Sequence, residues 1–324
     1  MSPKVEKIVD SVELGEGPHW DTQTQSLYFV DIYGKAIHKY VPSTKKHTKA
    51  VIGTYAKKIY TLNYKLAGTN HVSLIVPVEG QKDKFLVSVG RDLVIVTWDG
   101  LSEKISHQEK IYEVDDHPDT LTNRFNDGKC DASGRLWAGS MGPQPVNGYV
   151  EPHKGCFVSF GPNKQVKTHM TKVGISNGLA WSLDNKHFYY IDTHKGTVDQ
   201  YDFDLKNGTI SNCKAIFTLS QTDIKGALDG MAIDTDGNLW IAIFGGDRVI
   251  KIDPRKPETL LESIQLPAHQ ITSVAFGGPN LDQLYVTSAK LTTDGIEYPP
   301  PDHGATYVIT GTGSKGLPGV SFKL

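Results

Sequence analysis

Short runs of alternating apolar and polar residues, separated by turn-forming residues, recur along the whole chain. Each run follows a turn rich in Asp, Asn and Gly and ends in aromatic and aliphatic residues, which favours short β-strands. The clearest examples are WDTQTQSLYFVD (20–31), DASGRLWAGSM (131–141), WSLDNKHFYYID (181–192), DTDGNLWIAIF (234–244) and GPNLDQLYVTSA (278–289). No window has the sustained three-to-four-residue apolar period of a long helix. The pattern therefore predicts an all-β protein.

A second strand-like phrase follows several of these runs, as in AIHKYVPSTKK, TVDQYDFDLKNG and RVIKIDPRKPE. The repeating unit of strand, turn, strand and turn recurs irregularly at about 50 residues, as four-stranded propeller blades do. For 324 residues this predicts a six-bladed β-propeller of four-stranded antiparallel blades. Five or seven blades, and a β-sandwich with chance self-similarity, are the alternatives. We expect residues 1–324 to form one domain, with 51–78 as an extended hairpin or loop insertion within it.

Charge and composition narrow the class of protein. Thirty-four basic and thirty-six acidic residues give a formal net charge of -2, and no block of like charge is present, which argues against nucleic acid as a partner. The first residues lack the apolar core of a secretory signal, and no window approaches the ~20 apolar residues of a membrane span. We therefore expect a cytoplasmic protein without a membrane partner. The three cysteines, Cys130, Cys156 and Cys213, form no CxxC pair and are interpreted as reduced thiols.

Four short polar motifs stand out as candidates for chemistry. They are GEGPHW with Glu16, NRFNDG with Arg124, Asn126 and Asp127, SNGLAW with Asn177, and ALDGM with Asp229. Asn177 follows Asn126 by 51 residues and precedes Asp229 by 52, as equivalent positions of successive blades would. If Glu16, Asn177 and Asp229 share one end of the channel, their oxygens suit Ca²⁺, Mg²⁺ or Mn²⁺. Each motif alone is better explained as a hairpin turn, because Asn-Gly and Asp-Gly are strong turn signals, and only their common spacing brings the two explanations level.

The motifs GEGPHWD, NRFNDGKCDASGRLWAGSM, SNGLAWS, DGMAIDTDGNLWIAIF and TSVAFGGPNLDQLYVTSA together resemble the regucalcin/gluconolactonase (senescence marker protein) family. The resemblance extends from about Val5 to Leu324 and includes the insect branch of the family, which contains luciferin-regenerating enzymes. It implies a six-bladed propeller and one divalent cation (Ca²⁺, Zn²⁺, Mn²⁺ or Mg²⁺), with Glu16, Asn177 and Asp229 as ligands. It also implies that Arg124 and Asn126 bind the substrate. His19, close to Glu16 in sequence, is either a support for this metal site or a packed core histidine.

The resemblance implies a metal-dependent hydrolase of a lactone or similar ester. The cation would act as a Lewis acid and Asp229 as the general base, on a small-molecule substrate, in a monomer or weak dimer. Two alternatives stay open: a luciferin-regenerating enzyme acting on oxyluciferin, and a non-enzymatic calcium-binding regulatory protein. Gln144 lies near the place where some lactone-hydrolysing members carry a sugar-binding glutamate, so sugar specificity is not carried over to this chain.

Overall fold

The computed structural model of the protein describes residues 2–53, 70–144, 150–162 and 165–324. Strands dominate, and the helices that lie wholly within these ranges are three single turns of 3-10 helix: η1 (Pro118–Thr120), η3 (Thr193–Lys195) and η4 (Leu219–Gln221). Across the described ranges, no helix is long and apolar enough to cross a membrane. The hairpin or insertion predicted for 51–78 falls in large part on residues 54–69, which lie outside the described residues.

Four separate antiparallel sheets contain four strands each, paired in chain order. The first is β2 (Gly15–Asp21), β3 (Ser26–Asp31), β4 (Ala36–Val41) and β5 (Lys46–Val51), and the second is β6 (Ile75–Val78), β7 (Gln81–Val89), β8 (Asp92–Thr97) and β9 (His107–Glu113). The third is β10 (Arg124–Cys130), β11 (Leu136–Met141), β12 (Gly155–Phe160) and β13 (Val166–Val173), and the fourth is β14 (Ser176–Trp181), β15 (His187–Asp192), β16 (Thr197–Asp204) and β17 (Thr209–Thr218).

The remaining strands form a single eight-stranded sheet, in the order β1-β24-β23-β22-β19-β20-β21 with β18 paired to β19. Its strands are β1 (Lys4–Val9), β18 (Ala227–Ile233), β19 (Leu239–Phe244), β20 (Arg248–Ile252), β21 (Leu260–Gln265), β22 (Gln270–Gly277), β23 (Gln283–Ala289) and β24 (Thr306–Thr310). The prediction of six separate four-stranded blades is therefore wrong. The physical reason is one backbone pairing, between Phe244 and Gln270. It joins β19 to β22, so that the strands on either side belong to one continuous sheet.

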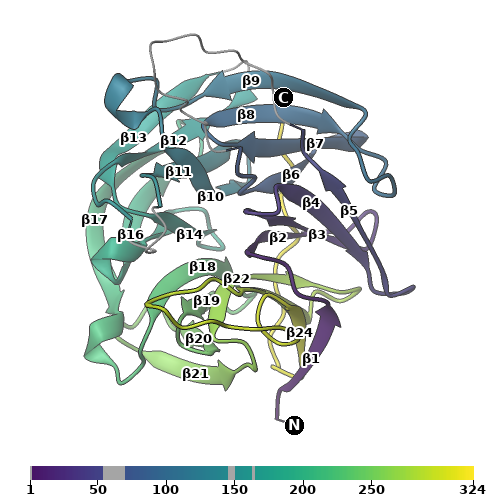
Figure 1. Cartoon of the computed structure of the whole chain (residues 1–324). Coiled ribbons are helices and arrows are strands. Elements are labelled where there is room, and N and C mark those ends of the chain that lie inside the picture. The colour runs from purple at the N-terminus through teal and green to yellow at the C-terminus, as the bar shows by residue number, and fades with distance from the viewer. Residues whose placement is uncertain (1, 54–69, 145–149, 163–164) are drawn as a thin grey trace.

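The sheets form a propeller-like ring, which Figure 1 shows face on. The first strands of the sheets lie closest to the centre, where β10 contacts β14, β14 contacts β18, and β2 contacts both β6 and β22. The N-terminal strand β1 pairs with β24 near the C-terminus, so both ends of the chain contribute to one sheet. After β24 a segment that we call the C-terminal strap, residues 315–323, crosses the ring toward β6 (Figure 1).

The recurring phrases of the sequence are the turns and second strands of the sheets, and buried aspartates explain two of them. Asp131 Oδ2 accepts a hydrogen bond from Trp137 Nε1 at 2.8 Å, and Asp234 Oδ2 accepts one from Trp240 Nε1 at 3.0 Å. The Oδ1 atom of each aspartate also accepts from backbone N–H groups of its own turn. Each aspartate thus ties a turn to the tryptophan of the next strand, as buried polar groups require partners.

Apolar side chains fill the spaces between neighbouring sheets. Val30 of β3 and Val87 of β7 belong to one buried cluster. Phe157 of β12 and Tyr190 of β15 belong to another, with ring centroids 4.6 Å apart. Because apolar burial is the main favourable term in folding, these contacts hold the sheets as a rigid frame around the centre of the ring.

Candidate functional site

Several inner strands share an irregularity. They are β2, β10, β14, β18 and β22. Strand pairing is interrupted once in each, at Glu16–His19, Phe125–Gly128, Asn177–Leu179, Leu228–Met231 and Ile271–Ser273. A β-bulge of this kind bends the strand and redirects side chains. The predicted residues Glu16, Asn126, Asn177 and Asp229 all lie at or next to these bulges, toward the same end of their strands.

A close approach of β14 to β18 positions Asn177. A Cβ atom on Gly178 would lie 2.7 Å from Met231 Cβ and 2.8 Å from the carbonyl oxygen of Asp229, so only glycine allows this approach. The amide of Asn177 donates from Nδ2 to Thr193 Oγ1 at 2.8 Å, and Thr193 Oγ1 in turn donates to the carbonyl of Leu228 at 2.9 Å. These bonds fix the amide, so that its oxygen faces the neighbouring inner strand β10.

Asn126 joins Asn177 to Arg124. Its Nδ2 donates to Asn177 Oδ1 at 3.1 Å and to the carbonyl of Ser176 at 2.8 Å, while its Oδ1 accepts from Arg124 Nη1 at 2.6 Å. Arg124 Nη1 also donates to the carbonyl of Phe125 at 3.0 Å. The predicted substrate residues and one predicted metal ligand therefore form a single buried network. Both hydrogen-bonding ends of the Asn126 amide are used within the protein.

Glu16 and Asp229 are two buried carboxylates that influence each other. Burial, followed by the charge of Asp127, raises the pKa of Glu16 from 4.5 to about 8. Burial, followed by the charges of Glu16 and Asp127, raises the pKa of Asp229 well above its ordinary value. The positive charge of the Arg124 guanidinium opposes both shifts.

The oxygen atoms at this point fit a divalent cation. Asp229 Oδ1 is buried and has no hydrogen-bond partner, which is costly for a carboxylate oxygen in a folded protein. Glu16 contributes a second carboxylate, held at Oε2 by the N–H of Gly17 at 2.9 Å. Among the described residues no three His, Cys, Asp or Glu side chains form a metal-binding group, so a cation here would need the amide oxygen of Asn177. Such a set leaves coordination positions for water or substrate.

Asp127 is a third buried carboxylate, and no separate role is predicted for it from its motif. Its Oδ1 accepts from the N–H of Gly128 at 2.7 Å, and burial raises its pKa. Its charge acts on Glu16 and Asp229 on one side and on Lys129 on the other. The charge of Asp127 therefore acts both on the candidate metal site and on Lys129.

Tyr33, His71 and Gln144 adjoin the network on the side of Arg124. The hydroxyl of Tyr33 donates to Gln144 Oε1 at 2.7 Å, and the rings of Tyr33 and His71 meet edge to face with centroids 4.8 Å apart. Burial, followed by the charge of Arg124, lowers the pKa of His71 to about 4, so the imidazole is neutral at pH 7. Sequence reasoning noted Gln144 but missed Tyr33 and His71, which lie in loops without a motif.

With this geometry established, comparison with known proteins defines the class. The model of the SMP-30/Gluconolactonase/LRE-like region matches residues 14–290. The chain belongs to this family, which confirms the prediction made from the motifs.

Individual relatives span the whole chain. A luciferin-regenerating enzyme of known structure is 44% identical, with a TM-score of 0.90 and coverage of 100% of both chains. Regucalcin from Xenopus laevis is 36% identical over 330 residues, covering 99% of each chain. Regucalcin from Homo sapiens is 34% identical over 330 residues, again covering 99% of each. A calcium-binding protein, regucalcin, from Agrobacterium tumefaciens has a TM-score of 0.80 at 22% identity, covering 100% of this chain and 98% of its own, and shares the fold.

Proposed function

We propose that the protein hydrolyses a lactone or a similar small ester, with one divalent cation held by Glu16, Asn177 and Asp229. The observation that carries the proposal is the buried, unpartnered Oδ1 of Asp229 beside a second buried carboxylate. Two such groups repel each other in the absence of a cation, and oxygen ligands of this kind suit Ca²⁺, Mg²⁺, Mn²⁺ or Zn²⁺. Membership of a family whose name includes gluconolactonase supports the reaction class.

Asp229 is the general base in this mechanism. When bound, a divalent cation supplies Lewis-acid polarisation of the ester carbonyl and favours the ionised form of neighbouring carboxylates. Ionised Asp229 takes a proton from the attacking water as the new carbon–oxygen bond forms. The ring carbon–oxygen bond then breaks, and the leaving alkoxide oxygen receives the proton. The products are a hydroxy acid and a regenerated Asp229 carboxylate.

Arg124 orients the substrate and stabilises negative charge on it. Its Nη1 is occupied by Phe125 and Asn126, which fixes the plane of the guanidinium and leaves the remaining N–H groups for an oxyanion. Asn126 acts mainly by positioning Arg124 and Asn177, because its amide is already engaged at both ends. Tyr33, His71 and Gln144 form the adjoining wall of the substrate site.

The test is hydrolysis of sugar and aliphatic lactones by protein stripped of metal and then supplied with Ca²⁺, Mg²⁺, Mn²⁺ or Zn²⁺ separately. We expect activity to return with at least one ion and to vanish in Asp229→Ala. Asp10→Ala, at an exposed carboxylate, is the matched control and retains activity. Activity that survives chelation would contradict the proposal. Bound metal without turnover on the whole panel would favour a calcium-binding regulatory protein.

A second candidate substrate is an oxidised heterocycle of the oxyluciferin type. The observation that favours it is the 44% identity to a luciferin-regenerating enzyme over the full length of both chains. The test is product formation from oxyluciferin with and without D-cysteine. A new product that depends on Asp229 would replace the lactone as substrate, and no product would remove this candidate.

A further inference from the structure

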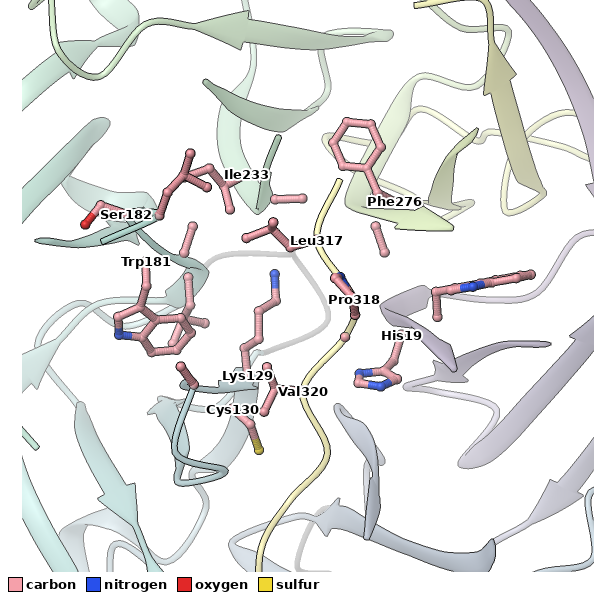
Figure 2. A pocket seen from close by; sticks show the side chains of 18 of the residues that line it. His19, Lys129, Cys130, Trp181, Ser182, Ile233, Phe276, Leu317, Pro318 and Val320 are labelled. Carbon is pink, nitrogen blue, oxygen red and sulfur yellow. The ribbon is translucent and has the colours of Figure 1, made fainter. Parts of the chain in front are cut away.

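A cavity of about 200 Å³ lies among later residues of the inner strands and the C-terminal strap (Figure 2). Its wall is built from later residues of the innermost strands, among them His19 of β2, Lys129 of β10, Trp181 of β14 and Phe276 of β22. Lys129 follows Asn126 by three residues, which corresponds to about 10 Å along an extended strand. The cavity is therefore distinct from the candidate metal site. The strands that carry that site also build this wall.

The C-terminal strap closes one side of the cavity. Backbone hydrogen bonds anchor the strap before the cavity, from Thr235 N to Lys315 O at 2.7 Å, and after it, from Phe322 N to Pro77 O at 2.8 Å. Leu317–Val320 line the cavity between these anchors, and within the described residues no backbone hydrogen bond holds this stretch. A ligand can thus enter by displacing four residues without breaking any of the sheets.

Lys129 gives the cavity a polar group that lacks a full set of partners. Figure 2 shows its side chain extending into the space between Trp181 and Pro318. Its Nζ donates one hydrogen bond, to the carbonyl of Met231 at 2.6 Å. A lysine amine has further hydrogen-bonding capacity, and an acceptor oxygen inside the cavity can use it. The rest of the wall is largely aliphatic and aromatic.

The charge balance selects a neutral ligand. Burial lowers the pKa of Lys129, and the charge of Asp127, two residues earlier on β10, only partly opposes this shift, so the surroundings of the amine disfavour its charged form. A second anion placed in the cavity would be buried without compensation, which is strongly unfavourable. A neutral oxygen can accept the available hydrogen bond without that penalty.

The volume selects the size of the ligand. An engineered apolar cavity of about 150 Å³ accommodates one benzene ring, and drug-sized ligands occupy roughly 300–1,000 Å³. A space of about 200 Å³ lies between these limits and fits one ring with a short substituent.

We propose that this cavity binds a small neutral molecule composed of one apolar ring and one oxygen acceptor. The oxygen accepts a hydrogen bond from Lys129 Nζ, and the ring packs against the apolar wall that includes Trp181 and Phe276. This binding site goes beyond the proposed hydrolysis, because its ligand meets neither Glu16 nor Asp229.

The test compares three ligands with the same number of non-hydrogen atoms, measured by calorimetry on the full chain. Acetophenone has a neutral acceptor, cumene has none, and benzoate is an anion. We expect acetophenone to bind about tenfold more tightly than cumene, as one added hydrogen bond allows, and benzoate to bind most weakly. In Lys129→Met the advantage of acetophenone over cumene disappears. Lys206→Met, at an exposed position, leaves it intact.

Two further variants separate this site from the candidate metal site. Asp229→Ala should bind acetophenone as the parent protein does, whereas Ala232→Leu, which fills the cavity, should bind none of the three ligands while still unfolding cooperatively. Ala232→Leu keeps the proposal testable if Lys129→Met does not fold. Equal affinity for acetophenone and cumene, tightest binding of benzoate, or loss of binding in Asp229→Ala would each overturn the proposal. So would the absence of binding by all three ligands.

Discussion

The candidate metal site and the cavity at Lys129 are built from the same inner strands but differ in the polar groups that they bury. At the candidate metal site, Glu16 and Asp229 repel each other and one oxygen of Asp229 has no partner. At the cavity end, Lys129 is surrounded largely by apolar side chains, and burial lowers its pKa while the charge of Asp127 opposes this shift. Local rules of burial are thus violated at both ends, since the indole N–H groups of Trp20 and Trp181 in the cavity wall have no partner, but at the candidate metal site the violation involves two carboxylates that repel each other. Proteins tolerate such violations at functional sites, which is why we place the proposed hydrolysis at the candidate metal site.

The largest expected effect comes from neutralising Asp229. Asp229→Asn keeps the shape of the side chain but removes both the proposed base and one charged ligand, so we expect kcat/KM for the lactone substrate to fall by about 10³-fold or more. The thermal stability of metal-free protein should stay unchanged or rise, because one of two repelling carboxylates is gone. Steady-state kinetics and calorimetry on the same samples measure both quantities. A variant that keeps its activity would show that Asp229 is not the base.

Asp234→Asn, five residues farther along the chain, should have the opposite result, with stability lost and activity kept. Asp234 is fully buried, accepts from Trp240 Nε1 at 3.0 Å and pairs with Lys251 Nζ at 3.2 Å. Asp234→Asn breaks the ion pair inside the protein, and we expect the free energy of unfolding to drop by about 2–4 kcal/mol. Activity per folded molecule should be retained. Urea unfolding with a parallel activity assay checks this, and a loss of activity without a loss of stability would contradict the division between the two aspartates.

These two aspartates also show what the sequence could predict. Asp234 belongs to a phrase that recurs as DASGRLW and DTDGNLW, and the structure explains the recurrence by the bond from each aspartate to the tryptophan that follows. Asp229 was found through its motif and through spacing, because the bulges recur in successive inner strands. Regular local interactions of this kind leave a signal in the sequence.

Features that depend on contacts between distant segments left no such signal. One pairing, Phe244 with Gln270, merges strands that the repeat pattern separates into two blades. The wall of Tyr33 and Gln144 joins loops 111 residues apart. The cavity at Lys129 is lined in part by the C-terminal strap, which returns across the ring from the end of the chain. Each of these outcomes is set by tertiary packing, which neither periodicity nor turn chemistry encodes.

A smaller effect, on thermal stability, should appear at low pH and comes from His19 in the cavity wall. Burial lowers the pKa of His19 from 6.5 to about 4, so the unfolded chain binds a proton more readily than the folded one within that range. The contribution of neutral His19 to the free energy of unfolding is present above pH 6.5 and is lost as the pH falls toward 4. We expect His19→Gln to show a shallower decrease in melting temperature on acidification, by roughly a few degrees. His107→Gln, on the outer strand β9, is the control and should follow the parent protein. Parallel curves for all three proteins would contradict this reading.

The smallest expected effect concerns Tyr33 and Gln144, which adjoin the candidate metal site on the side of Arg124. Tyr33→Phe removes the hydroxyl that donates to Gln144 Oε1 but keeps the ring that packs against His71. A neutral hydrogen bond contributes about 1 kcal/mol, so we expect a change of roughly fivefold in kcat/KM and little change in stability. If Gln144 contacts the substrate, KM should rise more than kcat falls, because a mobile Gln144 binds less well while Asp229 is unaffected. A matching change in Gln144→Ala, with no further loss in the double variant, would establish that both residues act through this one bond. Additive losses would instead mean that Tyr33 and Gln144 act independently.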